Sequence, residues 1–71
     1  MKKEYFSNRY ISSLAGCVAF LLNNGHKDKS FDEIFMMVVN YNQMNGLLEV
    51  VGWREWAKGI VFSAYTALKW Y

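Results

Sequence analysis

The chain has 71 residues, no proline, one cysteine, one histidine and a formal net charge of +2. Domains commonly run to about 100–150 residues, so this length predicts a single domain, residues 1–71, with no second domain. A charge so close to balance is too weak to indicate a nucleic-acid-binding face, and it argues against an acidic mimic of DNA.

Apolar side chains are abundant for so short a chain. Hydrophobic residues make up 54% of the sequence and aromatic residues 18%, whereas charged residues make up 20%. A chain of about 60 residues buries only about 60% of the surface that it exposes when unfolded. Some aromatic side chains are therefore expected to remain exposed, and exposed apolar surface on a small domain usually marks a binding site. The composition predicts an oligomer or a partner-binding module.

Two features bear on the compartment. The single cysteine, Cys17, cannot form an internal disulfide, which favours a reducing compartment. The charged segment 1–4 followed by the apolar run 10–22 imitates a signal peptide, but no Ala-x-Ala site follows it. No apolar run reaches the 18 or so residues that a membrane-spanning helix needs. We expect a cytoplasmic protein, in the host cytoplasm if phage-encoded, without integral membrane insertion.

The first element is expected to be a helix at about residues 4–23. Its apolar residues recur at spacings of three and four, which is the helical period; they are Phe6, Tyr10, Leu14, Cys17 and Leu21, with Ile11, Val18 and Leu22 beside them. Gly25 follows in a polar segment and can close the helix, because glycine adopts the left-handed backbone that a helix end requires.

The second element, residues 31–45, has the strongest local signal. Ser30 and Glu33 fit a capping box, in which each side chain bonds the other residue's backbone amide. Asn45-Gly46 would end this helix. Since Asn-Gly also favours a tight hairpin turn, the alternative is an α+β fold with a hairpin at 38–53.

The last third is again helical in pattern. Residues 47–51 are interpreted as a short helical turn that Gly52 ends. The final helix, at about 53–70, has an apolar face at helical spacing, namely Trp53, Trp56, Ile60, Ala64, Ala67 and Tyr71. The sequence therefore predicts an all-α fold, a compact three-helix bundle.

Small residues repeat on the first and last helices. They stand three or four positions apart, a spacing that lets two helix backbones approach closely, and comprise Ser12, Gly16, Ala19, Gly59, Ser63 and Ala67. We favour a tight internal crossing of these two helices, and the alternative is a self-association face that makes a homodimer.

The sequence offers little for catalysis. His26 lies in a polar turn and is interpreted as a solvated loop residue rather than a general base. Cys17 falls on an apolar stripe, where a free cysteine usually behaves as a small hydrophobe rather than a nucleophile. One cysteine and one histidine cannot supply the three or four ligands of a metal site. We therefore expect no enzymatic activity, no metal and no cofactor.

The surface of the last helix combines aromatic rings with cations. Such residues dominate the energetics of protein interfaces, because each ring removes a large area from water. The predicted partner-binding residues are Arg54, Trp56, Lys58, Phe62, Tyr65, Lys69 and Trp70.

Three functions remain open. The leading hypothesis is a small interaction protein that binds and sterically blocks, or scaffolds, a larger protein or complex. Its small size without a catalytic set is the profile of phage-encoded inhibitors of bacterial host or defence complexes, including anti-CRISPR proteins. The alternatives are a nucleic-acid-binding protein of the helix-turn-helix kind, for which the cations are few, and a peripheral membrane protein.

Overall fold

The computed structural model describes residues 5–69, which form a bundle of three helices. In chain order the elements are α1 (Asn8–Asn23), α2 (Phe31–Tyr41), the 3-10 helix η2 (Asn45–Glu49) and α3 (Trp53–Lys69). The all-α three-helix bundle predicted from the sequence is confirmed. The alternative hairpin at 38–53 is wrong, since residues 5–69 contain no strand and that segment holds the end of α2, η2 and the first residue of α3.

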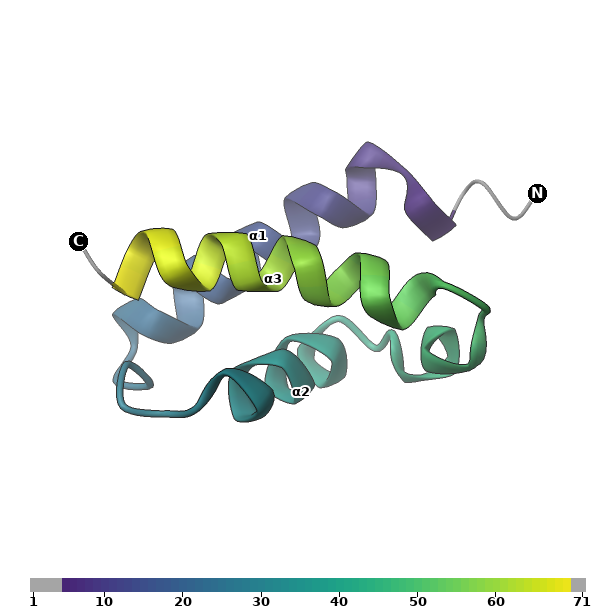
Figure 1. Cartoon of the computed structure of the whole chain (residues 1–71). Helices are drawn as coiled ribbons and strands as arrows, with labels where there is room; N and C mark the ends of the chain where they lie inside the picture. The colour runs from purple at the N-terminus through teal and green to yellow at the C-terminus, as the bar shows by residue number, and fades with distance from the viewer. Residues whose placement is uncertain (1–4, 70–71) are drawn as a thin grey trace.

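α1 and α3 run in the same direction, whereas α2 runs back against α3 (Figure 1). The radius of gyration is 11.6 Å, close to the value of about 11 Å expected for a compact chain of this length. Because α1 and α2 pack on different sides of α3, α3 has one flank beside α1, one flank beside α2, and an inward face between them.

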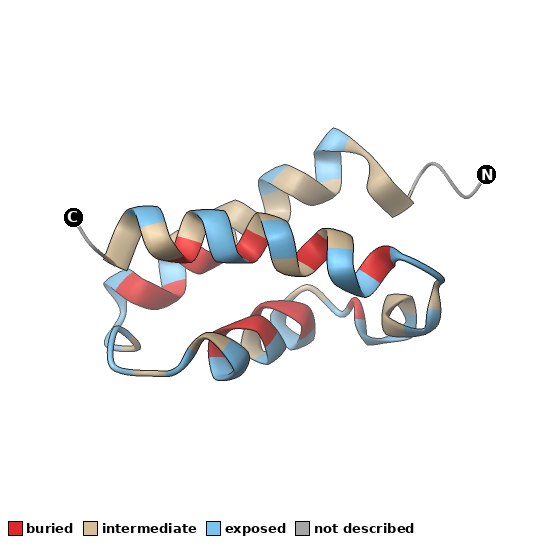
Figure 2. Cartoon of the chain, in the orientation of Figure 1, coloured by how far each residue is buried: buried red, intermediate tan, exposed pale blue. Residues whose placement is uncertain are grey.

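The core takes residues from all three helices and from the segment after α2 (Figure 2). Its buried members are Leu14, Val18, Leu21, Leu22, Ile34, Phe35, Val38, Val39, Met44, Trp53, Ala57, Val61 and Tyr65. On α3 these residues recur every four positions. The predicted face through Trp56, Ile60 and Ala64 is only half-buried and forms the flank toward α1, and Ala67 is exposed. The sequence misplaced the inward face because Trp56, Ile60 and Ala64 recur at the same spacing of four as Ala57, Val61 and Tyr65, and spacing alone does not show which of two adjacent stripes is buried.

α1 begins at Asn8 rather than near residue 4. Ser7 adopts an extended backbone, and the Tyr5 carbonyl just before it accepts a hydrogen bond of 2.9 Å from the Trp53 indole nitrogen. This bond satisfies the polar atom of a fully buried tryptophan and fastens the segment before α1 to the start of α3.

α2 ends at Tyr41, before the Asn45-Gly46 pair that was expected to end it. Gln43 takes a left-handed backbone with φ of 56°, and the Met44 amide donates back to the Val39 carbonyl at 2.9 Å. This is the six-to-one bond of a Schellman ending. Because Met44 is buried, core packing fixes the end of the helix there, and Asn45-Gly46 opens η2 instead.

The connection from α1 to α2 follows the sequence prediction. Gly25 has φ of 92° and the His26 amide donates to the Leu21 carbonyl at 3.3 Å, which closes α1. The Ser30–Glu33 capping box is confirmed: the Glu33 amide donates to Ser30 Oγ at 3.3 Å, and the Ser30 amide donates to Glu33 Oε1 at 3.0 Å.

Candidate protein-binding surfaces

The flank of α3 toward α2 carries the cations of that helix. Arg54, Lys58 and Lys69 lie along it, and Phe62 stands between the second and the third. Positions four, eight and fifteen residues apart share one side of a helix. We call Arg54, Lys58, Phe62 and Lys69, together with Met36 of α2, the aromatic-basic stripe.

Two cations of the stripe are held over aromatic rings. Lys58 Nζ lies 5.8 Å from the centroid of Phe35 on α2. Lys69 Nζ lies 5.0 Å from the centroid of Tyr65 and donates a hydrogen bond of 2.8 Å to its hydroxyl. Cation–π contacts of this kind hold an ammonium group in place without neutralising it.

Phe62 is the exposed aromatic residue of the stripe. Its side chain is 53% exposed and packs edge-to-face on Phe31 of α2, with ring centroids 5.4 Å apart. Because the Phe31 ring packs against it, the exposed Phe62 ring presents an ordered apolar surface that suits a contact with another molecule.

A groove of about 240 Å³ lies at the other end of the stripe. Its lining residues are Asp32, Phe35, Met36, Leu48, Arg54 and Lys58. Met36 is 41% exposed there. Its proximity to Arg54 results from the packing of α2 on α3.

The structure separates the seven predicted binding residues. Arg54, Lys58, Phe62 and Lys69 share the flank toward α2. Trp56 instead lines the opposite flank. Trp70 lies outside the described residues.

The prediction that Tyr65 is an exposed binding residue is wrong. It is only 9% exposed and belongs to the core, and its hydroxyl donates to the Lys29 carbonyl at 3.2 Å. A tyrosine can satisfy a helix-surface pattern and a core position equally, because its ring is apolar and its hydroxyl needs one polar partner.

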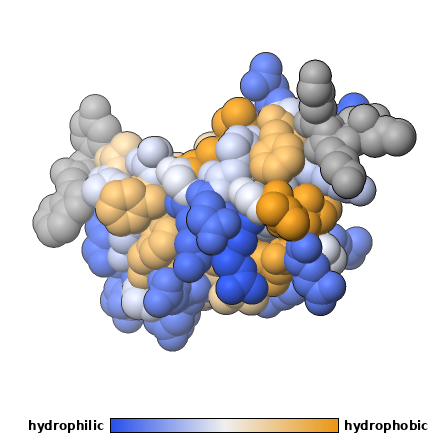
Figure 3. Space-filling model, turned by 45° about the vertical axis from the view of Figure 1, so that its right-hand side comes forward, coloured by the Kyte–Doolittle hydropathy of each residue, from blue (hydrophilic) through white to orange (hydrophobic). Residues whose placement is uncertain are grey.

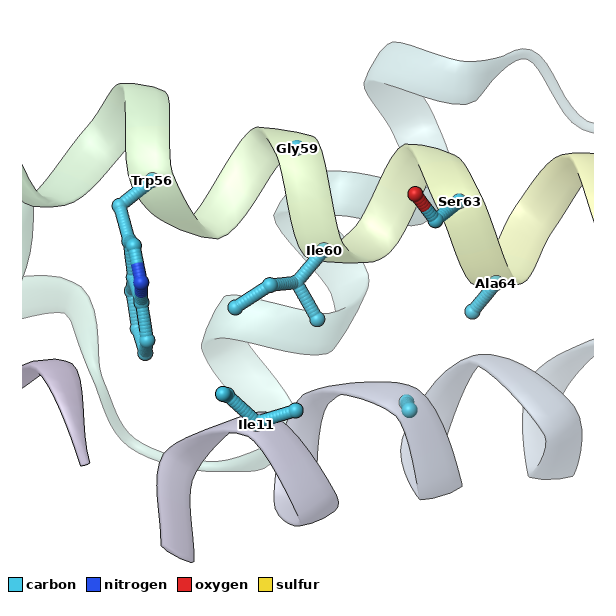
Figure 4. Close-up of a pocket in the computed structure, with 7 residues that line it drawn as sticks. Ile11, Trp56, Gly59, Ile60, Ser63 and Ala64 are labelled. Atoms are coloured by element: carbon cyan, nitrogen blue, oxygen red, sulfur yellow. The ribbon is translucent and has the colours of Figure 1, made fainter. Parts of the chain in front are cut away.

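The flank toward α1 is chemically different. An open groove of about 660 Å³ runs between α1 and α3, lined by Ile11, Ala15, Trp56, Gly59, Ile60, Ser63 and Ala64. In Figure 4, Trp56, Ile60 and Ala64 extend from α3 toward α1, and Ile11 rises from α1 toward Ile60. None of these lining residues is charged, so we call it the neutral groove.

The predicted tight crossing through the small residues is wrong. Of the six, Ala19 is half-buried and the other five are exposed. A Cβ built on Gly16 or Gly59 would meet no atom within 4 Å. α1 and α3 therefore approach through other residues, and of the six only Gly59 and Ser63 line the neutral groove. A self-association role for them stays a prediction.

A pair of exposed aromatic residues was missed by the sequence analysis. Phe20 of α1 and Tyr41 of α2 are 56% and 61% exposed and pack edge-to-face with centroids 6.4 Å apart. Figure 3 shows that on one face of the molecule hydrophobic residues gather in separate areas with hydrophilic side chains between them.

Cys17 and His26, the two titratable groups considered for catalysis, are both half-buried. Burial raises the pKa of the Cys17 thiol, and a hydrogen bond with Asn42 offsets this only in part, which keeps the thiol protonated near neutral pH. His26 is half-buried rather than solvated, and its Nδ1 is shielded without a hydrogen-bond partner. No three potential metal ligands cluster within residues 5–69.

Comparisons with known proteins give no relative. No family model, curated protein or solved structure matches this chain. Within residues 5–69, no helix combines the length and apolar character needed to cross a bilayer.

Proposed function

We propose that this chain is a non-catalytic helical interaction protein that binds a larger protein through the aromatic-basic stripe and sterically blocks or scaffolds it. The observation that carries the proposal is the exposed Phe62 ring between fixed cations. Rings and arginine at the centre of a patch supply most of the binding energy in protein interfaces, and a preformed arrangement lowers the entropy lost on binding.

The most specific form of the proposal is a phage-type inhibitor of a bacterial host or defence complex, acting in the cytoplasm as anti-CRISPR proteins do. The free cysteine Cys17 suits a reducing compartment. A rigid bundle would act by covering a functional surface of its target, which requires no chemistry of its own.

A nucleic-acid ligand is the second candidate and is less well supported. The stripe offers three cations, and the carboxylate of Asp32 lines the same groove as two of them. Proteins that bind nucleic acid with appreciable affinity usually make about six to ten phosphate contacts.

Site-specific photocross-linking in bacterial lysate tests the proposal. A photoreactive phenylalanine analogue replaces Phe62 in one variant and the exposed Asn23 in a matched control. We expect a discrete protein adduct at position 62 only, which excess unlabelled protein suppresses but the Arg54→Glu/Phe62→Ser variant does not. Equal adducts at both positions, no adduct at 62, or an adduct with nucleic acid would overturn the proposal.

A further inference from the structure

The aromatic-basic stripe has an order of charges that indicates the kind of partner it fits. Along α3 the order is two cations one turn apart, Arg54 and Lys58, then the exposed ring of Phe62, then a third cation, Lys69. At 1.5 Å per residue the stripe extends about 22 Å, the length of four helical turns.

The cations of the stripe are available to a ligand. Arg54 is exposed, and Lys58 and Lys69 are half-buried. Two carboxylates are nearby: Asp32 lines the groove beside Arg54 and Lys58, and the exposed Glu55, three residues before Lys58 and seven before Phe62, shares the stripe's side of α3. The three cations outnumber these two carboxylates by one, so the stripe keeps a net positive charge.

Two cations are also prepositioned. Lys58 and Lys69 are held over Phe35 and Tyr65, rings that the core buries. A lysine that is already ordered loses less side-chain entropy when a carboxylate binds it. The same rings limit the space beneath the ammonium groups, so a ligand must approach from outside along α3.

We propose that the aromatic-basic stripe binds an acidic amphipathic helix of a partner protein, with carboxylates on both sides of an apolar anchor. The anchor packs on Phe62 or enters the groove beside Met36, and the flanking carboxylates meet Arg54 and Lys58 at one end and Lys69 at the other. Carboxylates four residues apart on the partner would match the spacing of Arg54 and Lys58, because such positions are neighbours on one helix face. This inference rests on the proposed function and adds the chemistry of the partner.

A charge-exchange titration tests it. The probe is a synthetic helical peptide of about 18 residues, long enough to cover the stripe, with a central leucine and glutamates on the same face. A second peptide carries lysine in place of each glutamate. Binding is measured by calorimetry for the wild type, for Arg54→Glu/Lys58→Glu, and for Arg9→Glu/Lys27→Glu, which makes the same charge change at exposed sites elsewhere.

We expect the wild type to bind the acidic peptide, and the stripe variant to bind it at least tenfold more weakly while gaining affinity for the lysine peptide. The control variant should retain most of the wild-type affinity. Equal weakening in both variants, or tighter binding of a single-stranded oligonucleotide than of the peptide, would overturn the inference. If the peptide fails while the adduct at position 62 persists, only the partner chemistry is wrong; if both fail, the proposed function is wrong as well.

Discussion

The two flanks of α3 belong to one helix and share one core, yet they differ in almost every surface property. Toward α2, rings fill the space and cations lie over them, at 5.8 Å for Lys58 and 5.0 Å for Lys69. Toward α1, small and aliphatic residues leave an uncharged groove of about 660 Å³. Side-chain size contributes to the difference: the flank toward α2, where Phe35 packs, keeps only a groove of about 240 Å³, whereas Ala15, Gly59, Ser63 and Ala64 line the larger groove toward α1.

This contrast assigns the flanks different physical roles. A flank with ordered charges can select a partner by charge pattern and raise its association rate. An uncharged groove can only select by shape and apolar contact. Substitutions in the core residues between the flanks, and in the residues that support each flank, separate these two roles.

Trp53→Ala should have the largest effect. Trp53 is fully buried and bonds the Tyr5 carbonyl, so its loss should lower the free energy of unfolding by about 3–5 kcal/mol. Trp56→Ala, one turn away on the α1 flank and half-buried, should cost less than half of that. Urea denaturation followed by circular dichroism measures both. Equal losses would mean that Trp56, too, belongs to the core.

Tyr65→Phe tests whether the hydrogen bonds of the buried Tyr65 hydroxyl stabilise the α2 flank. The variant keeps the ring under Lys69 but removes the hydroxyl that donates to the Lys29 carbonyl and accepts from Lys69. We expect a loss of about 1–1.5 kcal/mol in the free energy of unfolding, with affinity for the acidic peptide reduced less than threefold. A larger loss of affinity at unchanged stability would show that Tyr65 contacts the ligand, as the sequence analysis predicted.

Ser30→Ala tests how much the α2 flank depends on the start of α2. The substitution removes the hydroxyl that caps the helix and should lower the free energy of unfolding by about 1 kcal/mol. Ser12→Ala is the matched control, because Ser12 is exposed within α1 and forms no cap. Thermal denaturation of the two variants should separate them, and equal midpoints would contradict a role for the capping box.

Gly59→Ala tests the neutral groove. A Cβ at position 59 would meet no atom within 4 Å, so the monomer should gain about 0.5–1 kcal/mol from the better helix former. Gly16→Ala on α1 is the matched control, since it is equally open. If light scattering finds a dimer that Gly59→Ala dissociates, the groove joins two copies and the predicted self-association face is correct in this part.

The smallest expected effect is on the pH dependence of the free energy of unfolding. Hydrogen bonds from the Ser30 backbone and side chain hold the pKa of the Glu33 carboxyl below its usual value. Its contribution to stability is therefore complete above the pKa of the unfolded chain and is lost as the pH falls below about 4. Glu33→Gln should be less stable than the wild type at pH 7 but should lose less stability on acidification. Parallel denaturation curves at pH 7 and pH 3 measure the difference.

Local signals explain which parts of the fold could be predicted. The capping box, the left-handed Gly25 and the periods of three and four depend on residues close in sequence, and they placed all three helices. Signals that involve distant residues failed: the end of α2 depends on the burial of Met44, and the start of α1 on the bond from Trp53.

The candidate site divides in the same way. The sequence predicted Arg54, Lys58, Phe62 and Lys69 as binding residues, and the structure places them on one side of α3. The sequence alone could not show that Trp56 lies on the other flank, that Tyr65 is buried, or that Met36 of α2 lies beside the stripe residues of α3.

The sequence by itself determined the three helices, the capping box of α2 and the glycine ending of α1, because each follows from interactions within a few residues. Only the tertiary structure decided which side of α3 faces inward and which groups stay accessible. The reason is geometric: on an apolar helix flanked by two others, the direction of burial depends on the volume of side chains from distant segments. Here aromatic rings of α2 pack on one flank of α3, and the other flank borders the groove beside α1.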